Sequence, residues 1–551
     1  MSLRSEYPIY LILFFAFAIR AVGITYGLPY LYHDDELLYV NPALRIIATG
    51  DLNPHWFHHP GSFVIYLFAI LFAITLSLYY VYSLLRGHLY NLAEFKTLIR
   101  HNPVFYYDKN PFLFHFLGRI LMLVFAVITI YLVYLLAKRI FNRQIALLGT
   151  FCLSICPIYV IFARSIRPDV PATMLILFSL YFLLRFTEGC KDVKWLILSS
   201  LFAGFSMAAK YTSGVVVFPI LIQCFIGDLK RMRSSAAGYF SEFFKIRTNL
   251  SKALLFTAAG FFIFAPFFIL DLRHSVPSLI DALNWKELGN DRLPGIQNYV
   301  WDFREAALKG FGGAFFAIFA FLGLCLVLLK RSSAKLMFFI FPVLYFLVIG
   351  AGKLKKLTWF IAIYPFEAIL FGVGFYATYR FLMQSVSLRV SKVKIVLLFI
   401  VVAAIGSYPI LKNDIEYAIK LTRVSTRTIA KDWIEGNLPG EAKIAYEKGT
   451  AHLHVKPKGK LRLMFVPEGI ASHSLSYYRE RSVEYIAISD SRKALIERYS
   501  KKFPRRLSVY KELDYETRLI KSISDNNRCG GTIRILKLED VPTENNKYLR
   551  L

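Results

Sequence analysis

The 551-residue sequence is poor in charged residues. Charged side chains make up 19% of the chain, against about 25% in an average soluble protein. Hydrophobic residues make up 56% instead. This balance excludes an ordinary soluble enzyme and predicts a polytopic α-helical membrane protein.

Cysteine is also scarce, with six residues in the chain. Five of them lie in or beside apolar runs, where a thiol behaves as a small hydrophobic group, and only Cys529 lies in a polar region. Cys152 and Cys156 are four residues apart, but a zinc site needs further ligands nearby. The cysteines therefore indicate neither a metal site nor a disulfide framework.

Acidic residues are few as well. The 37 Asp and Glu against 66 Lys and Arg leave a formal charge of +29. Nucleic-acid binding would require a basic face on a soluble fold. Much of the positive charge lies instead in short loops between apolar runs, such as 138–143 and 227–252, which the positive-inside rule places in the cytoplasm. No nucleic-acid partner is expected.

Apolar runs of about 17–25 residues are long enough to cross a bilayer. No small-residue cleavage site follows the first run, so we expect an uncleaved span. The stretch 195–226 is broken at Lys210 and predicts two short helices. A single crossing by 62–86 would place the basic loop 138–143 outside, unless 87–111 crosses back. We expect eleven crossings, with 62–86 partly embedded or re-entrant. The remaining runs are 7–27, 112–137, 145–163, 171–187, 253–270, 310–330, 335–351, 357–380 and 394–410.

The sequence thus predicts a membrane module over 1–410 and an extracytoplasmic α/β domain over 411–551, with about 11–12 transmembrane helices and a cytoplasmic N-terminus. The large outer loops are 28–61 and 271–309. In the second domain we expect helices over Thr426 to Asn437 and Ser491 to Lys502. Strands are expected over 443–446, 461–466, 484–489 and 532–538.

Three consecutive carboxylates, Asp34-Asp35-Glu36, follow the first span. They could form a solvated helix start, because acidic groups favour helix N-termini. They could also supply a general base at the membrane surface, with a neighbouring carboxylate that orients an acceptor or binds a metal. The residues alone leave both interpretations open.

Asp35-Glu36-Leu37-Leu38-Tyr39 resembles the Asp-Glu-x-x-Tyr signature in the first outer loop of GT-C glycosyltransferases. The most similar branch contains the protein O-mannosyltransferases and the bacterial aminoarabinose-transferase-like enzymes. His59-Pro60-Gly61 resembles the His-Pro-Pro motif of that family, with Gly61 in place of the second proline.

Later segments resemble the family in the same order, so the resemblance spans most of the chain. Residues 163–169 resemble its Ser/Ala-Arg-x-x-x-x-Asp stretch, and 204–211 resemble a Gly-rich segment that ends in Lys-Tyr. Residues 357–365 resemble its Tyr-x-x-Pro run, with Trp359-Phe360 in place of Arg-Tyr. Residues 433–440 are similar to the start of many of its C-terminal domains.

The resemblance implies an enzyme of the cell membrane that transfers a sugar, with inversion, from a polyprenyl-phosphate donor to a lipid, glycan or protein hydroxyl on the outer side. Asp35 matches the motif position of the base, and Asp34 is the alternative because the doubled Asp blurs the register. Glu36 would orient the acceptor, hold Asp35 or meet a cation. Tyr39, His59 and Asp169 are expected at the same site.

The departing phosphate requires positive charge. The candidates are Arg20, Arg164, Lys210 and Lys355. The alternatives are snorkelling for Arg20, a bond to an acidic residue for Lys210, pairing of Asp169 with Arg164 and Arg167, and a solvated loop for Lys355 and its neighbours Lys353 and Lys356. A divalent metal bound by Glu36, His58 and His59 is a further possibility.

Two other classes compete with an enzyme. A transporter or flippase of a lipid-linked glycan would place ionisable residues within its spans and often show repeated halves. The sequence shows no repeat, and its acidic cluster lies in a loop. A noncatalytic scaffold or sensor would use 411–551 for binding.

Overall fold

The computed structural model describes residues 3–57, 61–87, 93, 111–188, 192–234, 249–284, 295–329, 333–352, 356–385, 392–453 and 459–539. The chain forms two compact units. The first contains Met1–Ile24 and Asp35–Glu416, and the second contains Thr25–Asp34 and Tyr417–Leu551. The helical membrane module and the C-terminal α/β part expected from the sequence are both present.

In the described part of the first unit, every regular element is a helix. Its elements are α1 (Leu3–Ala21), η1 (Asp34–Glu36), α2 (Leu37–Thr49), α3 (Ser62–Leu85), α6 (Pro111–Ile140), α7 (Arg143–Ser154), α8 (Pro157–Phe162), α9 (Asp169–Glu188), α10 (Val193–Ala209), η2 (Tyr211–Val216), α11 (Val217–Ser234), α13 (Asn249–Phe264), α14 (Phe267–Leu270), α15 (Leu272–Asn284), α16 (Ile296–Phe303), η3 (Arg304–Gly310), α17 (Ala314–Leu329), α18 (Ser333–Gly350), η4 (Leu357–Ala362), α19 (Tyr364–Ser385) and α20 (Lys392–Thr422).

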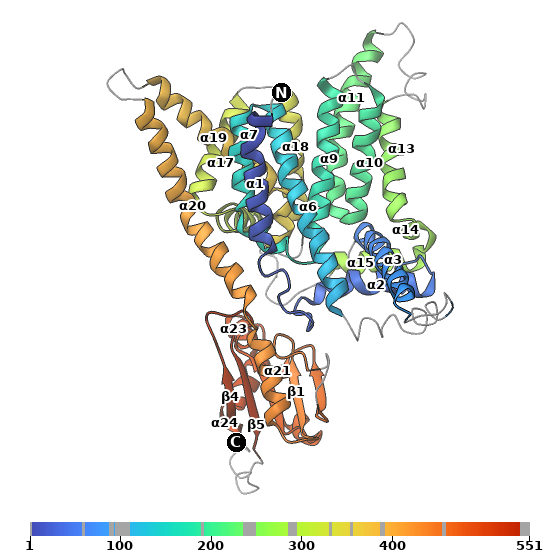
Figure 1. The fold of residues 1–551 in the computed structure, drawn as a ribbon, viewed down its shortest axis with the longest axis vertical. Coiled ribbons are helices and arrows are strands. Elements are labelled where there is room, and N and C mark those ends of the chain that lie inside the picture. The colour runs from blue at the N-terminus through green and yellow to red at the C-terminus, as the bar shows by residue number, and fades with distance from the viewer. Residues whose placement is uncertain are drawn as a thin grey trace. The chain divides into compact units, whose positions relative to one another are not determined.

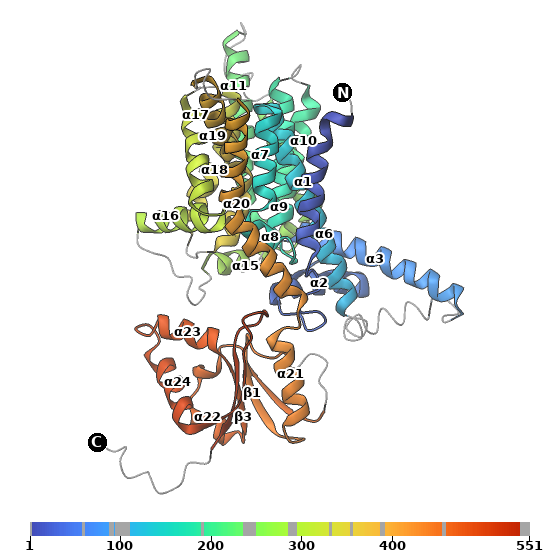
Figure 2. The same ribbon diagram turned by 60° about the vertical axis from the view of Figure 1, so that its left-hand side comes forward.

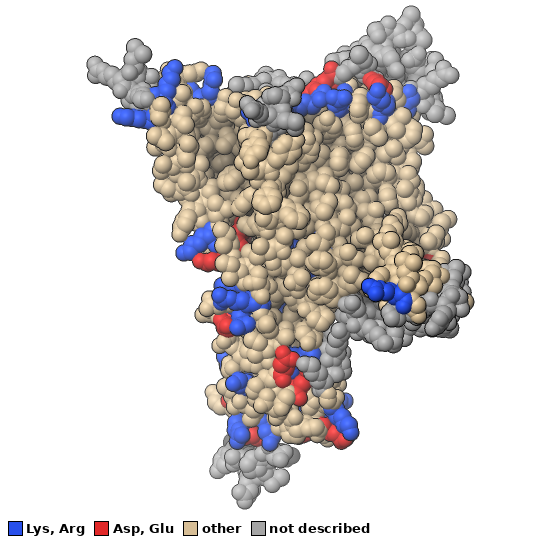
Figure 3. Space-filling model, viewed as in Figure 1, with Lys and Arg blue, Asp and Glu red and all other residues tan. Residues whose placement is uncertain are grey.

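Most of these helices run alongside one another (Figure 1). Among the described residues, four are long and apolar enough to span a membrane: Ser62–Leu85, Phe112–Ile140, Asp169–Glu188 and Lys392–Asn437. A bent pair, Ile296–Gly310 with Ala314–Leu329, is a fifth candidate. The space-filling view shows a broad belt of this unit with almost no charged side chains, bordered at one end by Lys and Arg (Figure 3). The count of eleven crossings stays a prediction.

Several predicted spans are interrupted. The run 145–163 is divided into α7 and α8 at Pro157, which occupies the first turn of α8, where its missing N–H is harmless. The run 253–270 is divided between α13 and α14 next to Pro266. The predicted break at Lys210 is confirmed, because α10 ends at Ala209 and η2 begins at Tyr211. Figure 2 shows α3 projecting outward at a steep angle to α6 and α9.

Glycines allow α10 and α13 to touch backbone to backbone. A Cβ added at Gly204 would lie 2.2 Å from the Thr257 carbonyl oxygen, and one at Gly260 would lie 2.4 Å from that of Leu201. Small residues at such crossings are typical of helix packing in membranes. This packing fixes α10 just before its end at Ala209.

The second unit contains α21 (Thr426–Asn437), β1 (Lys443–Glu447), β2 (Arg462–Val466), η5 (Ile470–Ser472), α22 (Leu475–Glu480), β3 (Tyr485–Ser489), α23 (Asp490–Arg498), α24 (Pro504–Glu516), β4 (Thr517–Ile523) and β5 (Ile533–Leu538). Its sheet has the order β2-β1-β3-β5-β4, with β1 parallel to β2 and β3, and β5 antiparallel to β3 and β4. Helix α21 covers one face and α22 to α24 cover the other (Figure 2). The sequence did not lead us to expect α22, α24 or β4.

The boundary between the units differs from the predicted one in two ways. It falls within α20, at Glu416, rather than at residue 410. The segment Thr25–Asp34 of the first outer loop also belongs to the C-terminal unit. Tyrosines hold it there, because the Tyr32 hydroxyl lies 2.6 Å from Thr428 Oγ1 and the Tyr26 hydroxyl lies 3.2 Å from Ser425 Oγ.

Glu447 lies buried at the carboxyl end of β1 and joins the three parallel strands. It accepts hydrogen bonds from the backbone N–H groups of Ile470 and Ser489, each at 2.9 Å, and from the Tyr510 hydroxyl at 3.2 Å. Burial raises the pKa of Glu447, and these bonds and Arg492 oppose the shift.

The stability of the second unit should therefore fall as pH rises above the ordinary glutamate pKa of about 4.3, because the folded chain holds this proton to higher pH than the unfolded chain. Glu447→Gln keeps one acceptor oxygen and should flatten that pH dependence. Hydrogen exchange of the β1 and β3 amides, corrected for intrinsic rates, measures it in the full-length protein. An unchanged slope in Glu447→Gln would contradict the assignment.

Candidate active site

The motif residue Glu36 is completely buried at the end of η1. Arg119 donates two hydrogen bonds to it, from Nε to Oε1 and from Nη2 to Oε2, both at 2.9 Å. His115 Nδ1 lies 3.3 Å from Oε2, and the Ile166 backbone N–H donates to Oε1 at 3.1 Å. Because His115 and Arg119 are four residues apart on α6, both face the same side. Glu36 thus ties η1 to α6 and to the segment before α9.

Of the roles expected for Glu36, the structure shows contact with a cation, and that cation is Arg119. Both carboxylate oxygens are already engaged, so binding a metal does not fit this arrangement. The described residues contain no group of three His, Cys, Asp or Glu side chains close enough to hold a metal ion. His58 and His59 lie outside those residues, so their role stays a prediction.

Asp35, one residue earlier, has a different environment. Its side chain is 49% exposed, and its Oδ2 lies 2.7 Å from Arg167 Nη2. The Arg167 guanidinium also lies over the Phe162 ring, 5.0 Å from the centroid. Asp35 therefore presents a carboxylate that solvent or a substrate can reach. The side chain of Asp34 lies outside the described part.

A second ion pair joins Asp169, the first residue of α9, to Lys210, with Nζ and Oδ1 2.6 Å apart. Lys210 has an extended backbone where α10 stops. Of the alternatives left open by the sequence, the bond of Lys210 to an acidic residue is present, and Arg167 pairs with Asp35 rather than with Asp169. The break in α10 brings the lysine to this carboxylate.

Tyr39 interacts electrostatically with members of both ion pairs. Its ring is buried, and Asp169, Asp35 and Arg167 interact with it electrostatically. Burial raises the pKa of the Tyr39 phenol, and the two carboxylates raise it further. The hydroxyl therefore stays protonated at neutral pH. A Cβ at Gly61 would lie 2.3 Å from the Tyr39 ring, so in this chain a larger residue at position 61 would require the ring to move.

Arg20 and Arg164 do not fit the expected role at the donor phosphate. Arg20 is fully buried in α1 and donates to the carbonyl oxygens of Ala16 at 3.0 Å and Ser154 at 2.9 Å. Arg164 is also buried and donates to the carbonyl oxygens of Ile19 and Arg20. The last carbonyl groups of a helix have no partner within it, and these arginines satisfy them. Both therefore fasten α1 to the segments around it.

The two large loops 28–61 and 271–309 contact each other. Asn53 Nδ2 donates to Asp271 Oδ2 at 2.8 Å, and His274 Nδ1 lies 2.6 Å from Asp271 Oδ1. The hydrogen bond from Asn53 and, to a smaller extent, the one from His274 lower the pKa of Asp271. Lys353 and Lys355 lie outside the described residues, so the role expected for them at the donor phosphate stays a prediction.

Sequence reasoning missed three residues of this site: His115, Arg119 and Arg167. His115 and Arg119 lie in a long apolar run, and an ionisable residue in such a run is a sign of a specific partner. Arg167 belongs to the 163–169 motif that the analysis noted, but Arg164 was preferred for the phosphate.

Removing the charge of Glu36 should destabilise the helical unit, because Glu36→Gln leaves Arg119 buried without a counter-charge. The expected loss is about 3–5 kcal/mol, typical of a broken buried ion pair. Thermal unfolding of the purified protein in detergent measures it. Asp35→Asn is the matched control, since its half-exposed ion pair should contribute little. Equal losses in the two variants would refute the anchoring role of Glu36.

One family model matches part of the chain. Residues 115–241 match the family model described as dolichyl-phosphate-mannose-protein mannosyltransferase. The matched segment contains His115, Arg119, Arg167, Asp169 and Lys210. No curated protein matches the chain significantly.

Among solved structures, ArnT from Cupriavidus metallidurans in the apo state aligns over 97% of this chain and 98% of its own, at 13% identity and a TM-score of 0.49. The same protein bound to undecaprenyl phosphate aligns over the same shares at 12% identity and a TM-score of 0.48. The apo oligosaccharyltransferase from Archaeoglobus fulgidus covers 90% of this chain and 71% of its own, at 12% identity and a TM-score of 0.48. Over residues 115–241, and in the motifs of the loop 28–61, the chain is similar to the dolichyl-phosphate-mannose-protein mannosyltransferase family.

Proposed function

We propose that this enzyme transfers a sugar from a polyprenyl-phosphate donor to a hydroxyl of a lipid, glycan or protein, with inversion at the anomeric carbon. The observation that carries the proposal is the contrast between adjacent carboxylates. Glu36 is buried and fully bonded, whereas Asp35 is half exposed and held by one arginine. A fixed, accessible carboxylate suits a general base.

In the proposed reaction, the acceptor hydroxyl attacks the anomeric carbon while its proton passes to Asp35. The bond from that carbon to the phosphate oxygen breaks, and the polyprenyl phosphate leaves with the electron pair. One displacement inverts the configuration, and no covalent intermediate with the protein is needed.

The leaving phosphate would be stabilised by Arg167 and Lys210. Each is bonded to a carboxylate, at 2.7 and 2.6 Å respectively. A bound phosphate that draws Arg167 away would also free the Asp35 oxygen to accept a proton. Donor binding would thus prepare the base. Such preorganised cations contribute roughly 10²–10³-fold to a rate.

We further propose that the site lies on the outer side of the cell membrane, with the N-terminus inside and the C-terminal unit outside. Helix α6 has 30 residues and is therefore about 45 Å long, enough to cross a bilayer. Arg119 lies toward its start, and Lys138 and Arg139 lie in its last turn. The basic end suits the cytoplasmic side. A divalent metal held by His58 and His59 remains a separate proposal.

Asp35→Asn should reduce sugar transfer by about 10²–10⁴-fold, because the amide cannot accept the proton. Membranes that contain each variant can be assayed with a radiolabelled polyprenyl-phosphate sugar, with immunoblotting to confirm equal protein levels. Asp34→Asn is the control and should retain transfer. Full activity of Asp35→Asn would exclude Asp35 as the base, and activity in the double variant would exclude the mechanism.

Lys210→Ala should raise the donor concentration needed for half-maximal transfer by about tenfold or more, as expected for loss of one charged phosphate contact. Lys210→Arg should recover part of the loss, because it keeps the charge near Asp169. Initial rates at varied donor concentration and fixed acceptor measure this. Poor expression with an unchanged donor dependence would instead indicate that the ion pair with Asp169 is structural.

A further inference from the structure

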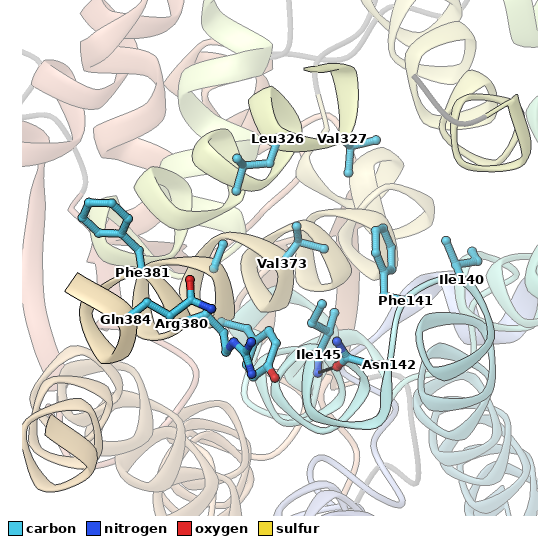
Figure 4. Close-up of a pocket in the computed structure, with 12 residues that line it drawn as sticks. Ile140, Phe141, Asn142, Ile145, Leu326, Val327, Val373, Arg380, Phe381 and Gln384 are labelled. Atoms are coloured by element: carbon cyan, nitrogen blue, oxygen red, sulfur yellow. Dashed lines mark hydrogen bonds between the residues drawn. The ribbon is translucent and has the colours of Figure 1, made fainter. Parts of the chain in front are cut away.

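A cavity of about 590 Å³ lies between the α6–α7 connection, α17 and α19. Figure 4 shows Leu326 and Val327 of α17 on one side, with Val373 of α19 and Phe141 across from them. Eight of the twelve residues that line it are apolar, and the polar groups come from Asn142, Tyr376, Arg380 and Gln384. This volume holds an alkyl chain or a similar apolar group.

The cavity is remote from the proposed active site. Ile140, at the end of α6, lines it, whereas His115 on the same helix contacts Glu36. About 38 Å of helix separates these two residues, which exceeds the roughly 30 Å of a bilayer hydrocarbon core. In the topology proposed above, on which this step rests, that separation puts the cavity at the opposite membrane interface, where lipid headgroups meet acyl chains.

Its polar and apolar groups are distributed as an amphipathic lipid requires. Arg380 and Gln384 are exposed, near the end of α19, whereas Ile145 and Val327 are buried. Phe381 is 67% exposed and extends the apolar surface outward. A guanidinium binds a phosphate diester through charge-assisted hydrogen bonds.

The surroundings favour a negatively charged headgroup. Lys138, Arg139 and Arg143 lie at the same α6–α7 connection, and Figure 3 shows Lys and Arg gathered at this end of the helical unit. Arg139 is paired with Glu188. Basic pockets between helices on the cytoplasmic side bind anionic lipids.

We propose that this cavity binds one anionic phospholipid, with an acyl chain against Val327, Val373 and Phe141 and the phosphate at Arg380. In the alternative interpretation, Arg380 binds no lipid and only balances the partial negative charge at the end of α19. The proposal does not depend on the identity of the sugar or on Asp35 as the base.

The test uses the full-length protein in a neutral detergent, titrated with phosphatidylglycerol or phosphatidylcholine and analysed by native mass spectrometry. The wild type should retain one phosphatidylglycerol at least about tenfold more tightly than phosphatidylcholine. Arg380→Gln should remove this preference, and Ala377→Trp, which fills the cavity, should weaken both lipids. Arg185→Gln is the matched control, because Arg185 lies in the last turn of α9 at the same end but does not line the cavity.

Equal retention of the two lipids, or unchanged phosphatidylglycerol binding in Arg380→Gln, would overturn the proposal. Loss of binding in Arg185→Gln as well would show only general attraction to a basic surface and would overturn it too. Polyprenyl phosphate serves as a third probe, and its exclusive retention at Arg380 would assign the cavity to the donor lipid instead. If Ala377→Trp does not fold, the comparison of Arg380→Gln with Arg185→Gln decides.

Discussion

The buried carboxylate of Glu36 is the interaction on which the candidate site depends. A charge without solvent is stable only when it is paired and hydrogen bonded, and Glu36 meets this need with Arg119, His115 and the Ile166 amide. These partners come from separate parts of the chain. By satisfying one carboxylate, the protein fixes the position of the next one, and Asp35 faces outward as a result. Two adjacent acidic residues thereby differ in burial and in their partners.

Other charged side chains of the helical unit are also paired with a partner. Asp169 is neutralised by Lys210, and Asp35 by Arg167. Arg20 and Arg164 bind carbonyl oxygens at helix ends instead of carboxylates. Arginine side chains therefore have two roles in this unit, and the two groups of arginines differ in how deeply they are buried. The buried arginines hold helices together, whereas Arg167 remains partly open beside the accessible carboxylate.

The sequence predicted the architecture well because its signals are local. Apolar runs indicate helices, and the Lys210 break and most strands follow from composition over a few residues. The ion pairs were harder, since Asp169 had several cations within reach in the sequence and only the three-dimensional path of α10 selects Lys210. His115 and Arg119 were overlooked because they lie inside an apolar run. Strand β4 was missed because its exposed face is polar and lacks the alternation of a half-buried strand.

The discontinuous second unit has a consequence for biosynthesis. Thr25–Asp34 emerges early from the ribosome, but the residues that hold it, among them Ser425 and Thr428, are made after more than two thirds of the chain. The segment that leads into Asp35 therefore waits for its packing partners until synthesis is nearly complete. A chain released early would carry every helix of the membrane unit and still lack a settled first loop. A chain that stopped before Ser425 would therefore lack the hydrogen bonds that hold Tyr26 and Tyr32 in the second unit.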